Sequence, residues 1–371
     1  MRIVMIGPTY PYKGGISQFT TLLSQELEKK NKVIFYSWKK QYPRFIIKNQ
    51  TDQKLKRNRR AEFVLSWSNP FSWLSTAVRI IKQKPDMVIY PWLTPFHGPI
   101  YFSINLLLRI FSGKSRIVYV CHNVMPHEKR PGDKILTKIG FMFVKNFIVH
   151  AKEEEKTLKK IKKGRINCLL GFHPLMEVYK TKEYSEEEKN KIREKLGISN
   201  NENVILFFGF VRPYKGLKHL LKAMPRINAR LVIAGEFWSD KQEYLDMINK
   251  LGIKDKIVLV DRYVPNDEIA DYFSIANLVV FPYESATQSG PLQIAYAFDK
   301  PVVCTSVGGL KDVVKNNITG YLIRPRDSKA ISDAVNRYFE QKKEKEFSDN
   351  IKEFKRRFSW ENYARLFYEL K

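Results

Sequence analysis

Short, wholly apolar segments alternate with segments of helical periodicity along almost the entire chain. The apolar segments lack the polar alternation of a half-exposed strand, which is typical of strands buried on both faces of a parallel sheet. The expected strands are Arg2–Ile6, Lys32–Tyr36, Met87–Tyr90, Ile117–Val120, Phe147–Val149, Val204–Phe208, Arg230–Ala234, Ile257–Val260, Leu278–Phe281 and Val302–Cys304. This alternation predicts an α/β architecture of doubly wound parallel sheets with helices on both faces.

The length of the chain, 371 residues, exceeds what one ordinary hydrophobic core covers, so two domains are expected. Between Tyr179 and Asn203 the sequence becomes highly charged and shows no strand pattern. We interpret this stretch as a linker with one exposed helix. The first domain is therefore expected to span residues 1–182 and the second to begin at residue 183.

The segment 281–324 contains the strongest candidate for a ligand site. After the strand ending at Phe281, a polar loop containing Thr287, Gln288, Ser289 and Gly290 leads into a helical segment opened by Pro291. Pro at the first helical position needs no amide partner, and Gly lets the backbone turn closely. Such a helix start leaves N–H groups and a positive dipole end facing the loop, which predicts an anion site for a nucleotide diphosphate.

Two cations follow another buried strand of the second half. Arg212 and Lys215 lie on a loop bounded by Gly209 and Gly216, directly after Val204–Phe208. Negative charge builds on the departing phosphate when a sugar leaves a nucleotide diphosphate, and fixed cations would stabilise that charge selectively. Either residue could be an ordinary surface charge, but their position after a buried strand favours a functional role.

The first half offers weaker candidates at the ends of its strands. Gly14 and Gly15 stand between the first strand and a helical segment, where phosphates and substrates often bind, although adjacent glycines are as often a plain turn. His122 directly follows Ile117–Val120 and His127 lies further along the same loop. A single His is more often a structural hydrogen bonder, and of the two His122 is the better site candidate.

The charge balance of the chain is strongly positive: 65 Lys and Arg against 38 Asp and Glu give a net charge of +27. Nucleic acid, an anionic membrane face and a phosphorylated ligand are all candidate partners for such a surface. The segment 39–60 interleaves basic residues with Tyr42, Phe45, Ile46 and Ile47. It is either a solvated loop or a contact with lipid head groups, where each basic residue contributes roughly 1 kcal/mol.

Targeting and cysteine signals point to a reducing compartment. The start of the chain lacks a cleavable signal pattern and reads as a strand, and the apolar segment Pro99–Phe111 is too short to span a bilayer, which takes about 20 residues. Cys121, Cys168 and Cys304 are widely spaced without metal-ligand spacing, which predicts buried thiols. We expect a cytoplasmic protein, either free or peripheral on the inner face of the cell membrane.

Several motifs, in this order and spacing, carry a resemblance to a known family: GGISQF, FFGFVRPYKGLKHLLKAM, LVIAGE, VPNDEIADYFSIANLVVFPY, PVVCTSVGGLKDVV and ITGYLIRP. The chain resembles the GT-B glycosyltransferases of the large retaining group called family 4, the glycosyl transferases group 1, over nearly its whole length. The resemblance implies two Rossmann-like domains facing each other across a cleft. The C-terminal domain, residues 183–350, would hold a nucleotide-sugar donor, the N-terminal domain would hold the acceptor, and residues 351–371 would cross back to the first domain.

The resemblance also implies roles for individual residues. Arg212 and Lys215 would be the cations on the donor diphosphate, in a loop that starts at Gly209. His122 would lie near the donor sugar, and Tyr263 would pack against the base. Gly15 would be the close-approach residue of the N-terminal loop, and Gly14 beside it would also belong to the donor site.

One departure from the family pattern concerns a pair of Glu residues beside the donor. The positions that match this pair hold Ala286 and Ile294, and starting the register at Glu284 places Leu292 at the partner position. Neither register restores the pair. The loop with Thr287, Gln288, Ser289 and Gly290 would instead contact the diphosphate and sugar, and Gln293 is a candidate substitute in ribose recognition.

The function expected from the resemblance is retaining transfer of a sugar from a UDP- or GDP-sugar to a glycan or lipid-linked acceptor at the cytoplasmic membrane face. No Asp-x-Asp pattern is present, so transfer without a metal or other cofactor is expected. An inactive GT-B scaffold remains an alternative because the Glu pair is missing. A nucleic-acid binder is disfavoured, since no binding motif is found and the charge is spread along the chain.

Overall fold

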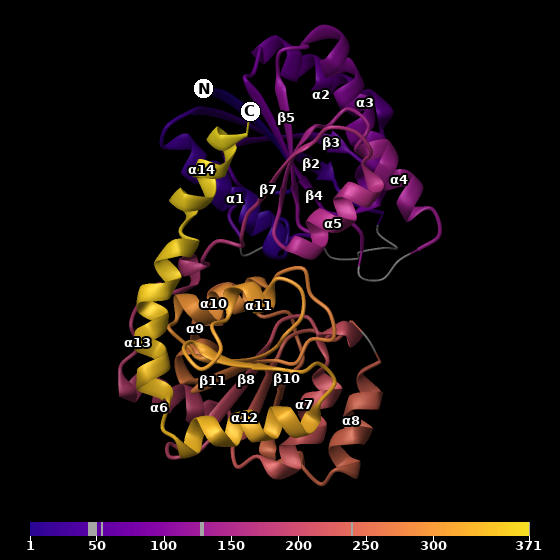
Figure 1. Ribbon diagram of the computed structural model, residues 1–371. Helices are drawn as coiled ribbons and strands as arrows, with labels where there is room; N and C mark the ends of the chain where they lie inside the picture. The colour runs from indigo at the N-terminus through magenta and orange to yellow at the C-terminus, as the bar shows by residue number, and fades with distance from the viewer. Residues whose placement is uncertain (44–49, 53–54, 127–129, 239, 371) are drawn as a thin grey trace. The chain divides into compact units, whose positions relative to one another are not determined.

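The computed structural model describes residues 1–43, 50–52, 55–126, 130–238 and 240–370. The chain divides into two compact units (Figure 1): unit 1 comprises Met1–Phe172 and Trp360–Lys371, and unit 2 comprises His173–Ser359. This division lies at 172/173 and 359/360, whereas the sequence pattern predicted 182/183 and 350/351.

Unit 1 is built on a seven-stranded sheet in which all pairings are parallel, in the order β3-β2-β1-β4-β5-β6-β7. Its strands are β1 (Arg2–Ile6), β2 (Lys32–Lys40), β3 (Ala61–Ser66), β4 (Met87–Trp92), β5 (Arg116–Cys121), β6 (Asn146–Val149) and β7 (Asn167–Leu170). Its α-helices are α1 (Gly15–Glu28), α2 (Pro70–Gln83), α3 (Gly98–Phe111), α4 (Asp133–Gly140), α5 (Lys152–Ile161) and α14 (Trp360–Glu369).

Two hydrophobic cores cover the two faces of this sheet. One core joins the strands to α2, α3 and α5, through residues such as Ile80, Ile104 and Leu158. The other joins them to α1 and α14, through residues such as Phe19 and Phe367. Strands covered on both faces must be apolar on both sides, which explains the uninterrupted apolar segments of the sequence.

Unit 2 repeats this plan with a six-stranded sheet, again parallel throughout, in the order β10-β9-β8-β11-β12-β13. Its strands are β8 (Val204–Phe208), β9 (Arg230–Ala234), β10 (Ile257–Val260), β11 (Leu278–Phe281), β12 (Val302–Thr305) and β13 (Gly320–Ile323). Its α-helices are α6 (Glu186–Lys195), α7 (Leu217–Ala223), α8 (Lys241–Lys250), α9 (Ile269–Ile275), α10 (Gly290–Ala297), α11 (Leu310–Val313), α12 (Ser328–Glu340) and α13 (Glu344–Phe354). The prediction of two doubly wound parallel-sheet domains is confirmed.

In each sheet the strand order reverses once, between β1 and β4 in unit 1 and between β8 and β11 in unit 2. At such a switch point the connections from the two neighbouring strands leave toward opposite faces, and a crevice opens between them at the carboxyl ends. In unit 2 the loops at this point are those that follow Phe208 and Phe281, which carry the predicted donor residues.

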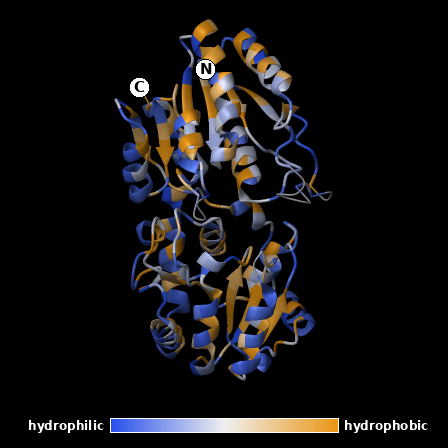
Figure 2. Ribbon diagram, turned by 90° about the vertical axis from the view of Figure 1, so that its right-hand side faces the viewer, coloured by the Kyte–Doolittle hydropathy of each residue, from blue (hydrophilic) through white to orange (hydrophobic). Residues whose placement is uncertain are grey.

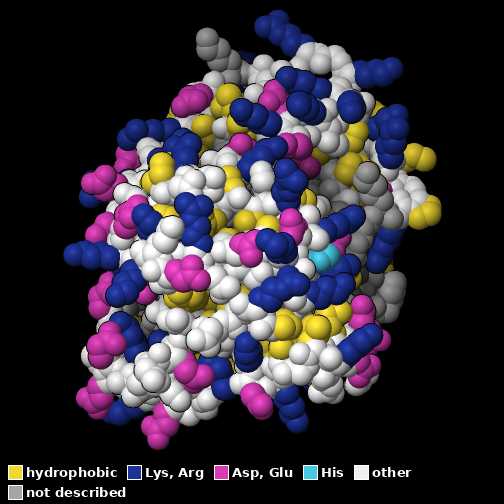
Figure 3. Space-filling view, turned by 60° about the horizontal axis from the view of Figure 1, so that its bottom comes forward, with side chains coloured by type: hydrophobic (Ala, Val, Ile, Leu, Met, Phe, Trp, Pro, Cys, Tyr) yellow, Lys and Arg dark blue, Asp and Glu magenta, His cyan; other side chains and the backbone are white. Residues whose placement is uncertain are grey.

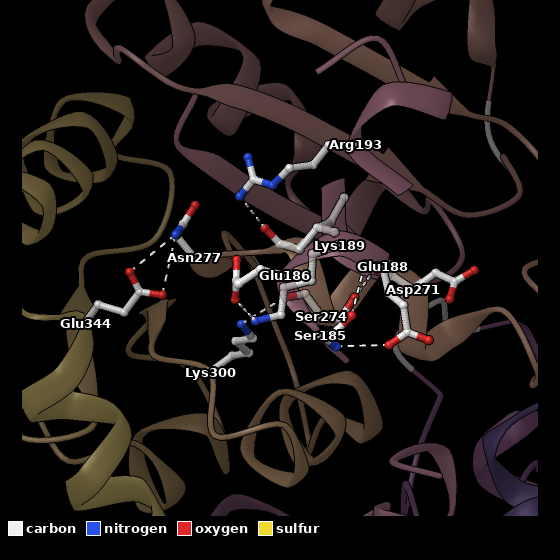
Figure 4. Close-up of polar contacts among 11 residues, drawn as sticks. Ser185, Glu186, Glu188, Lys189, Arg193, Asp271, Ser274, Asn277, Lys300 and Glu344 are labelled. Atoms are coloured by element: carbon white, nitrogen blue, oxygen red, sulfur yellow. Dashed lines mark hydrogen bonds and ion pairs between the residues drawn. The ribbon is translucent and has the colours of Figure 1, made fainter. Parts of the chain in front are cut away.

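Helix α6 is the exposed helix predicted in the charged stretch, and it belongs to unit 2 through polar contacts (Figure 4). None of its residues is buried. The Arg193 guanidinium donates to the carbonyl of Ile275 at 3.2 Å. Tyr184, just before the helix, donates to Asp271 at 2.8 Å. The charged composition of this stretch indicates a linker, yet both of these partners lie on α9.

The last helix returns the chain to unit 1, and two aromatic residues near its start, Phe358 and Trp360, fall on either side of the division. Phe358 is buried in unit 2, with its ring 5.5 Å from that of Phe354. Trp360 begins α14, and its ring lies 5.3 Å from that of Phe19 on α1. The deepest contacts of α14 come from Tyr363 and Phe367, both fully buried.

Three strands, β3, β7 and β13, were not predicted, and all three lie at sheet edges. The prediction of buried thiols holds for Cys121 and Cys304 but is wrong for Cys168, which is half-buried because it lies on the edge strand β7. Lys and Arg side chains are scattered over the face shown in Figure 3, with Asp and Glu among them. Among the described residues, no helix is both long enough and apolar enough to span a bilayer.

Candidate functional site

The loops that follow β8 and β11 lie against each other at the switch point of unit 2. The amide of Glu284 donates to the carbonyl of Tyr214 at 2.7 Å. Gly216 has a φ of 67°, and a Cβ added to it would lie 2.0 Å from the carbonyl oxygen of Pro282. Glycine is therefore required here, both for the left-handed backbone and for the close approach of the two loops.

Lys215 is the central charged residue of this crevice. Its side chain is almost buried, at 8% exposure. A Cβ built on Gly209 would lie 3.1 Å from the Lys215 Nζ and 3.6 Å from the Cγ of Pro291, so the ammonium lies close to the first turn of α10. Burial, with Coulombic repulsion from Arg212 as the second cause, lowers the pKa of Lys215 to about 7. An anion beside this ammonium would restore the protonated form.

Arg212 lies in an aromatic cluster on the same loop. Its guanidinium stacks over the ring of Trp238, with the Cζ 4.3 Å from the ring centroid. Phe210 lies between the rings of Trp238 and Tyr263, at centroid distances of 4.8 and 6.1 Å. The cluster brings the predicted phosphate cation and the predicted base-packing residue Tyr263 to one side of the crevice. Trp238 was not identified from the sequence.

The loop before α10 is held at both ends. Ser289 is the N-cap of α10, because its side chain accepts a hydrogen bond from the amide of Leu292 at 3.2 Å. Gly309 donates from its amide to the carbonyl of Thr287 at 3.1 Å. Within the described part of the chain, the side-chain oxygen of Gln288 is buried without a hydrogen-bond partner. The loop therefore presents a buried acceptor in addition to the helix amides.

Glu284 forms an ion-pair cluster that the sequence did not reveal. Its carboxylate lies 3.1 Å from Lys218 Nζ, 2.9 Å from His219 Nε2 and 2.8 Å from an Arg326 nitrogen. Burial opposes ionisation of this carboxyl, but the hydrogen bonds from His219, Lys218 and Arg326 outweigh it and lower the pKa of Glu284 to about 2. The cluster fastens the start of the 285–290 loop to α7 and to the segment before α12.

His173 is a second residue that sequence reasoning missed. It is buried at 5% exposure, and its Nε2 lies 3.7 Å from the position of a Cβ on Gly290. Its Nδ1 lies 2.9 Å from the carbonyl oxygen of Pro174, which can only accept, so Nδ1 carries the proton. Burial lowers the pKa of His173 to about 4, so the ring is neutral at pH 7 and Nε2 carries a lone pair.

The remaining predicted site residues belong to unit 1. Gly14 has a φ of 96° and caps α1, and Gly15 is the first residue of that helix. A Cβ on either glycine would meet nothing within 4 Å, so there is room at this helix start. His122 is buried at 2% exposure, and its ring lies 4.6 Å from that of Phe19. His127 lies outside the described residues, as does part of the basic segment 39–60.

The positions of the missing Glu pair are apolar in the structure as well as in the sequence. Ala286 and Ile294 are both buried, at 9% and 5% exposure. Gln293, the candidate substitute, is 1% exposed, and its side-chain oxygen has no hydrogen-bond partner among the described residues. No group of three or more His, Cys, Asp or Glu side chains in the described ranges is placed to hold a metal ion.

The chain is similar in sequence to known glycosyltransferases. Residues 188–357 match the family model of the glycosyl transferases group 1. An uncharacterized glycosyltransferase of Methanocaldococcus jannaschii is 33% identical over 188 residues, 49% of this chain and 47% of that protein. The lipopolysaccharide 1,2-N-acetylglucosaminetransferase of Salmonella typhimurium is 28% identical over 202 residues, 50% of this chain and 52% of that protein. The chain thus spans about half the length of these relatives.

Solved structures extend the similarity to the whole chain. The structure of HepE from Anabaena in complex with UDP superposes with a TM-score of 0.76 at 14% identity, covering 100% of this chain and 99% of that one. At this identity the likeness is one of fold. The chain therefore has the GT-B fold, and its residues 188–357 are similar to the glycosyl transferases group 1 family.

Proposed function

We propose that the chain is a retaining glycosyltransferase that moves a sugar from a UDP- or GDP-sugar to a glycan or lipid-linked acceptor. The observation that carries this proposal is the position of Lys215, whose almost buried ammonium lies beside Gly209 and Pro291 at the first turn of α10. This position falls within the segment that matches the family model. A lysine with a lowered pKa at a helix N-terminus suits a ligand that brings its own negative charge.

The chemistry that such a site supports is stabilisation of a leaving diphosphate. As the bond between the sugar and the phosphate breaks, negative charge grows on the diphosphate oxygens. The Lys215 ammonium, the Arg212 guanidinium and the amides of Ser289 and Gly290 at the start of α10 would face that charge and gain interaction energy as it develops. The contact of Arg212 with Trp238 keeps the guanidinium oriented.

Transfer with retention and without a metal ion is part of the proposal. Two cations and a helix start supply positive charge where a divalent ion would otherwise be needed. We expect turnover to be unchanged by a chelator. Loss of activity with chelator, restored by added magnesium or manganese, would contradict metal independence.

The acceptor is proposed to be a surface glycan or its lipid-linked precursor, bound mainly by unit 1. A relative that is named for lipopolysaccharide N-acetylglucosamine transfer supports this class of acceptor. Gly14, Gly15 and His122 are the unit 1 residues proposed to act in the reaction, with His122 near the donor sugar. Substitution of His122 by Gln should lower kcat while UDP binding is retained.

The test of the function is nucleotide-sugar turnover. UDP- and GDP-sugars are first screened by thermal shift, because a bound donor stabilises the fold in proportion to its occupancy. Release of UDP or GDP is then measured with and without glycan acceptors, for the wild type and for Lys215→Met. If a donor stabilises the fold but no nucleotide is released, even when glycan and lipid-linked acceptors are both supplied, that result would favour an inactive scaffold. A mobility shift with duplex DNA at physiological salt would favour the nucleic-acid alternative.

A further inference from the structure

The outer side of unit 1 carries an unusual amount of exposed apolar surface on α2. Phe71, Leu74 and Val78 are exposed at 80%, 47% and 48%. Their spacing of three and four residues places them on one side of the helix. The opposite side of α2 holds Ala77 and Ile80, which are fully buried against the sheet. The helix is therefore apolar both toward the core and toward solvent.

The next helix continues this surface. α3 packs directly against α2 on one side and against α4 on the other. Ile110 and Phe111 at its end are exposed at 61% and 67%, and Leu106 and Phe102, respectively one and two turns earlier on the side of Ile110, are partly exposed. Figure 2 views the molecule from the side on which Figure 1 labels these helices, and several helical turns on the near side of unit 1 are coloured as hydrophobic.

The third helix adds two further apolar side chains. On α4, Ile135 is 65% exposed, and Met142, just after the helix, is 52% exposed. We call the outer surface of these three helices, with the apolar residues named above, the α2–α3–α4 face. Monomeric soluble proteins rarely leave large apolar surfaces uncovered, so exposed apolar side chains on three neighbouring helices favour an occupant for this face.

The charges around the α2–α3–α4 face are almost all positive. The sequence has no Asp or Glu between Glu62 and Asp86, and none between Asp86 and Glu128, so α2 and α3 contain no acid. The one acid of α4, Asp133, accepts a hydrogen bond from the amide of Arg130 at 2.8 Å. The exposed lysines on these helices and their loops are Lys82, Lys84, Lys114, Lys134, Lys138 and Lys145.

Exposed apolar side chains together with lysines distinguish between three possible occupants: a second copy of the chain, a nucleic acid and a lipid bilayer. A second copy of the chain docked on the same face would bring lysines opposite lysines with no acid to pair them. A nucleic acid would satisfy the lysines but would leave Phe71, Leu74 and Phe111 in water. An anionic bilayer satisfies both, because apolar side chains enter the head-group region while lysines meet lipid phosphates.

We propose that the α2–α3–α4 face docks on an anionic lipid bilayer. The proposal is independent of the transfer reaction, because no residue of the face belongs to the loops of unit 2. It also differs from the prediction that segment 39–60 contacts lipid, because it places the apolar contact on regular helices. Charge would attract the protein to the surface, and the stripe on α2 would anchor it.

The test is flotation of the full chain with vesicles of phosphatidylcholine alone or of phosphatidylcholine with 30% phosphatidylglycerol. The wild type should bind the anionic vesicles at least tenfold more tightly than the neutral ones. Phe71→Ser/Leu74→Ser/Val78→Ser should lower that affinity at least tenfold, and Lys134→Ser/Lys138→Ser should lower it several-fold. The triple variant should keep its thermal transition and its affinity for UDP, because the three side chains are exposed.

Matched controls lie on unit 2. Val178→Ser/Ile318→Ser removes two apolar side chains with exposures of 46% and 49%, and Lys250→Ser/Lys254→Ser removes two exposed lysines. Both should change vesicle affinity less than twofold. Failure of the wild type to bind anionic vesicles, or equal losses in the controls, would overturn the proposal.

Two further outcomes would also overturn it. In the first, the wild type sediments as a dimer and does not bind vesicles, while the triple variant sediments as a monomer. This result would make the face a self-association surface. The second is unchanged vesicle binding in the triple variant with loss of binding in Arg57→Ser/Arg59→Ser/Arg60→Ser, which would assign the contact to segment 39–60.

Discussion

The affinity of the protein for a nucleotide-sugar should fall as the pH rises above the pKa of Lys215. Burial, assisted by Arg212, lowers this pKa to about 7, so the free protein loses the ammonium proton where an exposed lysine would keep it. A bound diphosphate places negative charge beside Nζ and returns the pKa to a high value. Above about pH 7, binding therefore requires uptake of one proton.

The size of the effect follows from the fraction of protein that is already protonated. With a pKa of about 7 in the free state, that fraction falls from about nine-tenths at pH 6 to about 3% at pH 8.5. The apparent affinity should therefore weaken about 30-fold across this range, which corresponds to about 2 kcal/mol. An exposed lysine would give almost no change over the same range.

Isothermal titration calorimetry with intact UDP-glucose measures both the affinity and the number of protons taken up on binding. The diphosphate of this ligand is a diester and takes up no proton in the range, unlike the terminal phosphate of UDP. Titrations in buffers with different ionisation enthalpies give the number of protons bound, which should be near zero at pH 6 and near one at pH 8.5. Lys215→Met should bind weakly and without pH dependence. Constant wild-type affinity, or the same pH dependence in Lys215→Met, would refute the reasoning.

The same buried lysine makes a prediction for stability in the absence of ligand. Its pKa falls from 10.5 to about 7 on folding, so between these values the unfolded chain binds more protons than the folded one. The contribution of Lys215 to the free energy of unfolding should therefore rise with pH between about 7 and 10.5. Lys215→Met removes the penalty and should raise the thermal midpoint at pH 6. A lower midpoint than the wild type would mean that the ammonium is stabilised by the fold.

Three further substitutions test the neighbouring backbone and ion pairs. Glu284→Gln leaves Lys218, His219 and Arg326 without their carboxylate partner and should cost about 1–3 kcal/mol of unfolding free energy and raise KM for the donor, whereas Glu187→Gln, in an exposed pair, should cost less than about 0.5 kcal/mol. Gly308→Ala places a Cβ 1.5 Å from the carbonyl oxygen of Ala286 and should abolish donor binding in calorimetry, whereas Gly252→Ala, also at positive φ but without a neighbour within 4 Å, should leave it intact. Gly15→Val should keep the thermal midpoint because nothing lies within 4 Å, while kcat/KM falls; unchanged turnover would remove Gly15 from the site.

The architecture was predictable because the central strands are buried on both faces and therefore show as apolar segments. The prediction missed β3, β7 and β13, edge strands whose sequences are interrupted by polar residues or glycine. β7 begins at Asn167 and is half-buried along most of its length, and β3 carries Glu62, which points to solvent and pairs with Arg79. β13 begins at Gly320, a residue that is depleted in strands. The edge strand β10 was predicted because its four residues, Ile257–Val260, are all apolar.

From the sequence, only those parts of the candidate site that directly follow predicted strands could be identified. The loops at 209–216 and 285–290 could be placed together because parallel strands bring their carboxyl ends to one edge. Glu284 was considered only as a member of the missing pair, since its partners come from α7 and from Arg326, far away in the sequence. His173 lies near Gly290 through the path of the chain after β7, and no periodicity encodes that path.

The side chains at and beside the positions of the missing Glu pair are apolar or carry neutral acceptors. A carboxylate at Ile294 would have to be desolvated, because that side chain is 5% exposed within an apolar helix. The acceptors that the structure offers there are neutral: the side-chain oxygens of Gln288 and Gln293, which have no partner among the described residues. Neutral acceptors bind sugar hydroxyls less strongly than a carboxylate, since charged groups form the stronger hydrogen bonds. They do not repel a diphosphate, however, and they do not raise the pKa of Lys215 in the empty site. The pKa of Lys215 is lowered to about 7 by burial and by Arg212, and the positive charge of the lysine becomes fully available when the donor arrives.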